Sequence, residues 1–299
     1  MEDKILASII IRAYNEEKNI GKLLSKIKNQ KVNFKYEIIV VDSGSTDKTV
    51  EIAKRFNTKV VNIKPKEFSF GFSLNKGIEA SLGDICVFIS AHCFPEDDRW
   101  LKNIVLPHLE DEKIALVYGR QRGNFRTKFS EKQIFKQWFP NNGKGCHEHP
   151  FCNNANSSIK KKIWNKVKFD EVLTGLEDID WAKKVISMGY KIFYNPDARI
   201  IHVHNETWQQ IMNRYKREAI AFYTIFPKEH FGILSFVKYF LLNVTKDFKS
   251  AFAEGVFKKE FLNVIKFRYF QFLGTYKGAR YKKEITEELK KIFYYRGKN

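Results

Sequence analysis

Glu177 and Asp178 are adjacent carboxylates in the segment Gly175–Trp181, which we expect to open a helix that ends near Gly189. A carboxylate held near a hydroxyl group can act as a general base and take the proton of that hydroxyl as it attacks an electrophile. Successive side chains diverge on a helix, so only one of the two acids can face a substrate. The simpler interpretation is that both acids only favour the N-terminus of the helix.

Three more polar segments each follow an apolar run. Ser90-Ala91-His92 follows Ile85–Ile89, and Pro95 prevents the apolar run from continuing as a strand. RAYNEE, residues 12–17, follows ILASIII, and DSGSTD, residues 42–47, follows YEIIVV. In an open α/β sheet, ligands bind just beyond the carboxyl ends of the strands. The pattern therefore predicts a ligand site at these strand ends, although ordinary loops would also read as polar.

Alternating strands and helices must position these residues. Apolar runs predict strands at 5–11, 36–41, 59–63 and 85–89, with helices beginning near 16, 46 and 74 between them. This spacing is typical of βαβ units and predicts an α/β fold with a mainly parallel sheet and flanking helices. Neither G-x-G-x-x-G nor the P-loop motif occurs, so the common glycine-rich phosphate cradles are absent from the sequence.

The middle of the chain lacks the periodic pattern of apolar residues that predicts strands and helices. Between Gly119 and Pro150, glycines, prolines and charges predict a long irregular loop, which inside a compact domain is usually functional or mobile. The remaining expectations are a helix at 100–109, a strand at 114–118, a Ser-capped basic helix at Asn156–Val167, and two strands at 190–194 and 198–204 joined by a turn at Pro196-Asp197.

Composition limits the class of protein. The chain has 299 residues, 43% hydrophobic and 29% charged, which is typical of a globular protein, and a formal net charge of +19, which favours anionic partners. Four unevenly spaced cysteines do not resemble a disulfide framework and indicate a reducing compartment. No apolar stretch reaches the roughly 18 residues of a spanning helix, and the N-terminus does not resemble a signal peptide. We expect a cytoplasmic protein that can lie on a membrane without crossing it.

The segment 231–299 differs from the rest in composition. It holds 15 Lys and Arg against 6 Asp and Glu, interleaved with Phe and Tyr at helical spacing. We expect residues 1–230 to form the main α/β domain and residues 231–299 a basic, aromatic-rich extension of amphipathic helices. The extension either packs on the main domain or lies on an anionic membrane surface, with charges such as Lys258, Lys259, Lys266 and Arg268 facing the lipid.

Taken together, RAYNEE, DSGSTD, SAHCFPEDD, GLEDIDWA and HVH resemble the inverting family 2 glycosyltransferases of the GT-A fold, a Rossmann-like nucleotide-binding fold. FSFGFSLNKGIEASLGDICVFISAHCFPEDDRWL is similar to the central segment of the rhamnosyltransferase-like bacterial enzymes of surface-polysaccharide assembly, and FCNNANSSIKKKIW to a later one. The resemblance covers roughly residues 5–225. It implies transfer of a sugar from a nucleoside diphosphate to a glycan acceptor, with inversion at the anomeric carbon.

The resemblance also implies roles for individual residues. Asp178 matches the family's general base, with Glu177 beside it and Asp180 as a weaker candidate. Asp42 matches the residue that binds the nucleotide base, which Ala13, Tyr14 and Glu16 would flank. Relatives often carry a basic residue near Phe72–Leu74, and this chain has none there, so we expect Lys76 or Arg120 to take that role. The expected donor-binding residues are Ala13, Tyr14, Glu16, Asp42, Lys76, Ser90, Ala91 and His92.

The metal site departs from the family pattern. Most relatives carry Asp-x-Asp at the end of the central strand, whereas this chain has Ser90-Ala91-His92, so His92 occupies the position of the metal-binding Asp. The resemblance implies His204 as the second ligand, with His202 as an alternative. Imidazole suits Mn²⁺ better than Mg²⁺. We expect a divalent ion, Mn²⁺ or Mg²⁺, at His92 and His204; in the alternative, His92 contacts the diphosphate directly.

Three other interpretations remain. The chain could be a catalytically silent, nucleotide-binding scaffold of a polysaccharide-assembly complex, because Asp-x-Asp is missing. Its charge would suit a nucleic-acid binder, but no recognised binding motif occurs, so we expect no nucleic-acid partner. Cys146-His147-Glu148-His149 with Cys152 could suggest zinc, but the spacing is unlike that of structural sites. We expect a lipid-linked glycan acceptor and a peripheral position on the inner face of the cytoplasmic membrane.

Overall fold

The structure is a computed structural model that describes residues 4–295, and these form two compact units. The first unit contains the chain up to Arg122, together with Phe139–Val172 and Glu177–Val203. The second contains Gly123–Trp138, Leu173–Leu176 and the chain from His204 onward. The boundary expected at residue 230 therefore falls inside the second unit, and a separate domain from residue 231 stays a prediction.

The first unit is built on a nine-stranded sheet whose main path runs β3-β2-β1-β4-β8-β6-β9-β5, with β7 paired to β9. Neighbours among β1 to β4 are parallel, and so is the pair β6 and β9; the other pairs are antiparallel. The strands are β1 (Ile5–Ala13), β2 (Lys35–Asp42), β3 (Lys59–Asn62), β4 (Ile85–Ser90), β5 (Cys93–Pro95), β6 (Ile114–Arg122), β7 (Gly145–His147), β8 (Asn156–Lys160) and β9 (Lys191–His202).

The helices of this unit connect the strands. The α/β architecture expected from the sequence is confirmed, and the expected helix at 100–109 is split into two. The helices are α1 (Ile20–Lys28), α2 (Thr49–Arg55), the 3₁₀ turn η1 (Pro65–Glu67), α3 (Phe70–Glu79), α4 (Trp100–Val105), α5 (Pro107–Glu110), α7 (Lys161–Trp164) and α8 (Glu177–Ser187).

The central strands β1, β2 and β4 are buried on both faces, which is why they read as continuous apolar runs. Helix α3 lies so close to β1 that a Cβ at Gly77 would come within 2.4 Å of Ile10. A larger residue at position 77 would push the helix away from the sheet. This tight packing fixes the ends of the strands, where the polar segments begin.

The prediction of a helix at Asn156–Val167 was wrong for the first half of that range. Residues 156–160 form β8, an antiparallel strand between β4 and β6, and only a short helix follows. The polar residues Asn156 and Ser158 are fully buried and hydrogen-bonded: the indole of Trp100 donates to Asn156 and Ser158 donates to a backbone carbonyl of α4. Buried polar side chains in a strand mimic a helix cap in the sequence, which explains the error.

The prediction of a turn at Pro196-Asp197 was also wrong, because β9 is one strand that runs through both residues. Its pairing with β6 shifts register between Gly119 and Gln121, opposite the segment that contains Pro196. Proline cannot donate to a ladder and is tolerated at such irregularities. The stretch from Gly119 to Pro150 is likewise more regular than expected, since it contains the end of β6, a helix at 129–138 and β7.

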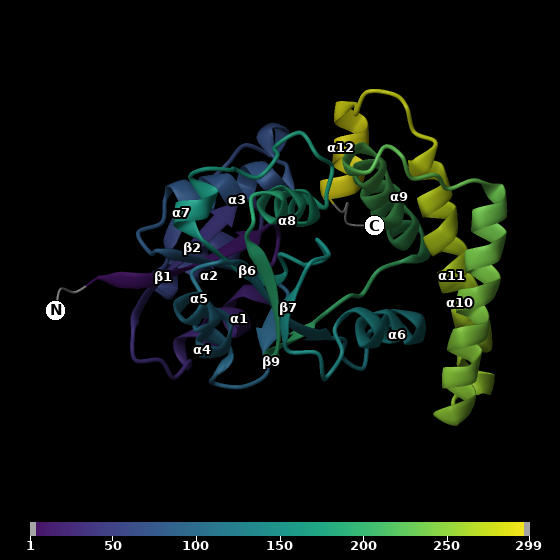
Figure 1. Ribbon diagram of the computed structural model, residues 1–299, viewed down its shortest axis with the longest axis horizontal. Coiled ribbons are helices and arrows are strands. Elements are labelled where there is room, and N and C mark those ends of the chain that lie inside the picture. The colour runs from purple at the N-terminus through teal and green to yellow at the C-terminus, as the bar shows by residue number, and fades with distance from the viewer. Residues whose placement is uncertain (1–3, 296–299) are drawn as a thin grey trace. The chain divides into compact units, whose positions relative to one another are not determined.

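The second unit is helical. Its helices are α6 (Phe129–Trp138), α9 (Trp208–Ile225), α10 (Ile233–Ala253), α11 (Phe257–Ala279) and α12 (Glu287–Tyr294). Within this unit α11 packs on α9, and α10 runs beside α11 (Figure 1). Arg268 of α11 and Asp247 of α10 form a buried two-point ion pair with both distances at 2.8 Å. Arg268 therefore serves the packing of these helices and is not one of the surface charges expected there. In the part of the chain that the structure describes, no helix has the length and apolar content needed to span a membrane.

Candidate functional site

Three strand ends meet at one edge of the sheet in the first unit. In the parallel register Ala13 pairs with Asp42, and Arg12 pairs with Ser90. The carboxyl ends of β2, β1 and β4 therefore lie side by side, as the sequence predicted. The polar segments that follow these strands are brought to the same edge.

Asp42 lies at the end of β2 and is buried, with 3% of its surface exposed. Its Oδ2 accepts the backbone N–H groups of Gly44 and Ser45, both at 3.0 Å, and Gly44 takes the positive φ of 92° that this turn requires. Its Oδ1 is also buried and has no hydrogen-bond partner among the described residues. A buried carboxylate oxygen without a donor is rare in proteins and suits a ligand N–H.

The turn after β1 is tied to the turn after β2. The backbone N–H of Asn15 donates to the Ser45 hydroxyl at 2.8 Å, and that of Glu16 donates to Thr49 at 2.7 Å. Asn15 itself has a φ of 52°, a left-handed conformation that asparagine tolerates better than most residues. These bonds hold Ala13, Tyr14 and Glu16 beside Asp42, the arrangement expected of a pocket for a nucleotide base.

His92 follows β4, and its Nδ1 donates to Oε1 of Glu16 at 2.8 Å, because an ionised carboxylate can only accept. The ring of His92 stacks on that of His202, at the end of β9. Nδ1 of His202 lies 2.8 Å from Oε1 of Gln121. Each ring is held through Nδ1, so either would bind a metal ion through Nε2. Second partners of this kind are typical of metal-binding histidines.

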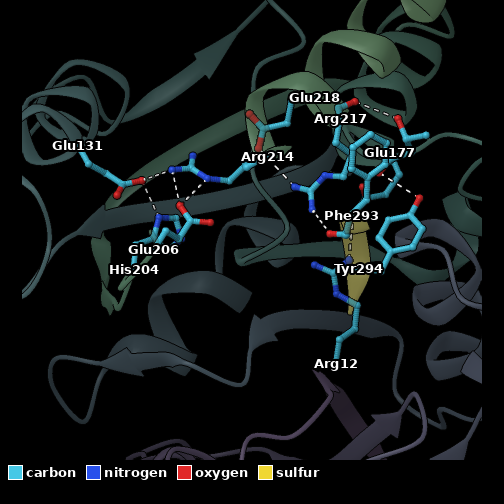
Figure 2. Close-up of polar contacts among 11 residues, drawn as sticks. Arg12, Glu131, Glu177, His204, Glu206, Arg214, Arg217, Glu218, Phe293 and Tyr294 are labelled. Carbon is cyan, nitrogen blue, oxygen red and sulfur yellow. Dashed lines mark hydrogen bonds and ion pairs between the residues drawn. The ribbon is translucent and has the colours of Figure 1, made fainter. Parts of the chain in front are cut away.

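His204, the other expected metal ligand, belongs to the second unit. There its Nδ1 donates to Glu131 at 2.6 Å, and Arg214 pairs with both Glu131 and Glu206 (Figure 2). Burial alone would raise the pKa of Glu131, but the charges of His204 and Arg214 hold it below its ordinary value. The two carboxylates are thus neutralised by protein groups. They orient His204 and are poor candidates for metal ligands of their own, and the metal role of His204 stays a prediction.

Lys76 lies two turns into α3 and pairs with Glu79 at 2.9 Å. Its ammonium group also lies 5.5 Å from the centre of the Phe72 ring. The ion pair raises the pKa of Lys76. These contacts are those of an exposed helix face, and a role of Lys76 in donor binding stays a prediction.

Glu177 and Asp178 begin α8, directly after Leu176, whose φ of 56° is unusual for a leucine. Both acids are buried, and Oδ2 of Asp178 accepts the backbone N–H of Asn154 at 2.9 Å. Glu177 accepts from Arg12, at the end of β1, with a distance of 3.3 Å between Nη1 and Oε1. The ion pair with Arg12 brings the acidic pair to the same sheet edge as Asp42 and Ser90.

The environment of Asp178 changes its acidity. Burial, and then the neighbouring negative charge of Glu177, raise the pKa of Asp178 to about 7, although two backbone N–H groups and Arg12 act in the opposite direction. A carboxyl group with a pKa near 7 can both accept and release a proton at neutral pH. A buried carboxyl group with a raised pKa is a candidate for a general base, and this role of Asp178 stays a prediction.

Three residues that support the site were missed in the sequence. Arg12 lies in the RAYNEE segment, but nothing local shows that it pairs with Glu177, which is 165 residues away. Asn154 and Gln121 contact Asp178 and His202 from segments without a recognisable motif. In the Cys-His-Glu-His segment both ring nitrogens of His147 have protein partners: Nδ1 lies 2.9 Å from the backbone oxygen of His149, and Nε2 lies 3.1 Å from the Tyr118 hydroxyl. None of the four cysteines forms a disulfide bond.

Comparison with known proteins identifies the family. The model of glycosyl transferase family 2 matches residues 8–168. The O-antigen chain rhamnosyltransferase RfbN of Salmonella typhimurium is 30% identical over 223 residues, which cover 70% of this chain and 69% of that protein. The O-antigen chain rhamnosyltransferase WbaN of Salmonella anatum is 28% identical and is covered over 60% of each chain. The chain thus spans well under the full length of both relatives.

Solved structures share the fold at low identity. A mannosyltransferase of Pyrobaculum calidifontis, solved with GDP-Man and Mn²⁺, superposes with a TM-score of 0.64 at 18% identity, covering 94% of this chain and 88% of that one. Glucosyl-3-phosphoglycerate synthase of Mycobacterium tuberculosis, solved with Mn²⁺, UDP and glucosyl-3-phosphoglycerate, gives a TM-score of 0.55 at 20% identity, covering 74% and 80%. The expected GT-A fold is confirmed, and the family match to more than half of the sequence shows that this chain belongs to glycosyl transferase family 2.

Proposed function

We propose that this chain is an inverting glycosyltransferase that moves a sugar from a nucleoside diphosphate to a glycan acceptor, with Asp178 as the general base. Asp178 takes the proton of an acceptor hydroxyl as the hydroxyl oxygen bonds to the anomeric carbon. The bond from that carbon to the diphosphate oxygen breaks on the opposite face, and the diphosphate leaves with the electron pair. The observation that carries the proposal is the contact between Glu177 and Arg12, because it puts the acidic pair at the sheet edge that Asp42 occupies.

For the donor, we propose that Oδ1 of Asp42 accepts an N–H of the nucleotide base. Burial of an unpaired carboxylate oxygen is costly, and a ligand donor would remove that cost. Ala13, Tyr14 and Glu16 flank this position, and Ser90, Ala91 and His92 would lie along the diphosphate. Lys76 is a further candidate for a donor contact, with weaker structural support.

For the cofactor, we propose a divalent ion, Mn²⁺ in preference to Mg²⁺, held by His92 with His202 or His204. The residues fit such an ion because each of the three rings is oriented through Nδ1 by an oxygen acceptor. Bound there, the ion would offset the negative charge of the leaving diphosphate. Neighbours of the same fold were solved with Mn²⁺, which supports the choice of metal.

For the acceptor, we propose a growing, lipid-linked surface glycan that the enzyme meets on the inner face of the cytoplasmic membrane. Two relatives are O-antigen chain rhamnosyltransferases, which supports a surface-glycan acceptor. Helices α10 and α11 expose large apolar side chains, with Leu234 82%, Phe252 78% and Leu262 63% accessible. Exposed lysines flank them at positions 238, 246, 249, 258, 259 and 266. Apolar residues beside lysines are typical of a helix that lies on an anionic membrane.

The replacement of Asp-x-Asp by Ser90-Ala91-His92 favours one alternative, a catalytically silent scaffold that only binds nucleotide. Two experiments separate it from the enzyme. A thermal-shift panel of nucleoside diphosphates, with and without Mn²⁺, identifies the donor base. Incubation with the matching sugar nucleotides, without acceptor, then measures slow release of the diphosphate. An enzyme hydrolyses its donor, whereas a scaffold binds the nucleotide and releases no sugar.

A further inference from the structure

Glu177 has a cationic partner that its neighbour Asp178 does not share directly. Nη1 of Arg12 and Nδ2 of Asn154 both approach Oε1 of Glu177 at 3.3 Å. The side chains of Glu177 and Arg12 are 5% and 15% exposed, so water screens this ion pair weakly. The cation and the amide donor therefore hold the Glu177 side chain in a fixed position.

Arg12 is held in this position. Its guanidinium carbon lies 4.8 Å from the centre of the Phe70 ring, at the start of α3, which restricts its orientation through a cation–π contact. Its backbone belongs to β1, between the pairing partners β2 and β4. Arg12 therefore acts as a fixed charge and not as a mobile surface residue.

Asp178, in contrast, accepts only from backbone N–H groups among the described residues, from Asn154 at 2.9 Å and from Ile179 at 2.8 Å. The charged or titratable groups that face it are Glu177 on its own helix, Arg12 from β1, and Cys152 from the segment before β8. Cys152 is neutral, because burial and the two nearby carboxylates raise the pKa of its thiol. The charge of Arg12 therefore acts on both adjacent carboxyl groups.

We propose that Arg12 is a positioning residue of this acidic pair: by holding Glu177 as the charged partner, it leaves Asp178 as the carboxyl group that exchanges the acceptor proton. The inference rests on the proposed function only because that function supplies the acceptor hydroxyl whose proton Asp178 takes. Asn154 supports the same division, since its side chain binds Glu177 while its backbone N–H binds Asp178. The raised pKa of Asp178 agrees with this assignment.

The test is a titration of the Asp178 carboxyl carbon by NMR in full-length protein labelled with ¹³C-aspartate, with Asp178→Asn used to assign the signal. In Glu177→Gln the neighbouring negative charge is absent, and we expect the Asp178 midpoint to fall by about 1 pH unit or more. Adding Arg12→Met to Glu177→Gln removes the cation, and we expect the midpoint to rise again by about 1 pH unit. Arg12→Lys in the same background keeps the charge and should move the midpoint less. Using the Glu177→Gln background avoids two carboxyl groups sharing one proton.

Arg55→Met is the matched control, because Arg55 forms a similar pair with Glu51 on the exposed surface of α2, and it should leave the midpoint unchanged. An unchanged midpoint in Glu177→Gln, or no difference between Met and Lys at position 12, would overturn the inference. The titration needs no substrate, so the role of Arg12 and the proposed function can be contradicted independently of each other. If Asp178→Asn transfers sugar like the wild type, the proposed base is wrong. If it is inactive while Met and Lys at position 12 give the same midpoint, only the role of Arg12 is wrong.

Discussion

The imidazole ring of His92 stacks on that of His202, with ring centres 5.2 Å apart and an angle of 26° between their planes. The two rings come from segments after β4 and at the end of β9, and β5, which follows His92, pairs antiparallel with β9. Glu16 forms a hydrogen bond with Nδ1 of His92, and Gln121 forms one with Nδ1 of His202. This chain therefore places an oriented imidazole, that of His92, where most relatives are expected to use a carboxylate, and stacks it on a second oriented imidazole.

The metal proposal predicts that His92→Ala weakens Mn²⁺ binding by at least about tenfold, because a lost ligand costs more than its orienting partner, whose removal typically costs 10–100-fold. Binding is measured by the loss of the free Mn²⁺ signal in electron paramagnetic resonance, with nucleoside diphosphate present. His202→Ala should also weaken binding if His202 is a ligand. His230→Ala, at an exposed histidine, is the control. Full transfer activity in excess chelator would leave His92 as a direct contact of the diphosphate.

Asp178→Asn should slow sugar transfer by about 10²–10⁴-fold at saturating acceptor, because the proton acceptor is lost. The affinity for nucleoside diphosphate should stay within about twofold, since Asp178 does not contact the donor base in the proposal. Asp84→Asn is the control, as Asp84 forms an exposed ion pair with Lys4. Transfer by Asp178→Asn at near the wild-type rate would exclude Asp178 as the base.

The raised pKa of Asp178 also predicts how stability depends on pH. The carboxyl group has an ordinary pKa of 3.8 and a folded value of about 7, so between these values the folded state binds more protons than the unfolded state. The free energy of unfolding should therefore fall as pH rises from about 4 to about 7 and level off above it. Above pH 7 an acidic group that disfavours the folded state remains ionised at the site.

Asp178→Asn lacks this contribution, so its free energy of unfolding should fall less than that of the wild type between pH 5 and pH 8. An amide at this position places N–H donors against a backbone N–H, because both carboxylate oxygens accept such bonds. That cost is independent of pH and cancels in the comparison. Urea unfolding at both pH values measures the difference. Identical pH dependence of the two proteins would show that Asp178 titrates normally.

Asp42→Asn should weaken binding of the matching nucleoside diphosphate by about tenfold or more, because hydrogen bonds to charged groups contribute about 1.5–3 kcal/mol. The amide can also reverse and present a donor to the base, which adds to the loss. Isothermal titration calorimetry measures the effect. Asp98→Asn, at an exposed ion pair with Lys31, is the control. Equal affinity of the Asp42 variant would move base recognition elsewhere.

The membrane proposal predicts that Lys258→Glu, Lys259→Glu and Lys266→Glu together reduce sedimentation with acidic vesicles, since each cation near an anionic surface contributes about 1 kcal/mol. All three side chains are exposed, so the melting temperature should hold. Arg268 is left unchanged, because reversing its charge would break the buried pair with Asp247. Leu234→Ser tests the apolar contribution.

The vesicle experiment has matched controls in lipid and protein. Vesicles of neutral phosphatidylcholine should bind the wild type weakly. Charge reversal at three exposed lysines of the first unit, Lys54, Lys102 and Lys113, should have a smaller effect on binding. If acidic vesicles sediment the triple α11 variant as well as the wild type, the charge of α10 and α11 serves another partner.

The sequence alone identified the features of the site that depend on local patterns of residue types. A buried parallel strand has to be apolar along its length, so β1, β2 and β4 were recognised by their composition, and the polar residues after them marked the site. Helix α8 was recognised because acids at an N-terminus followed by a helical period carry a local signal. The order of these motifs also identified the family.

Only the tertiary structure decided which residues support the site. The sequence predicted a Ser-capped helix at Asn156–Val167. In the structure, Asn156 and Ser158 lie buried in β8, where Trp100 and the backbone of α4 are their hydrogen-bond partners. The contacts between Arg12 and Glu177 and between His92 and His202 join segments far apart in the chain. Such pairs depend on strand register and on an irregularity in β9, and a register shift moves side chains without changing the local pattern. Chemistry-bearing residues can therefore be named from the sequence, whereas their partners, and with them their acidity and orientation, are set by packing.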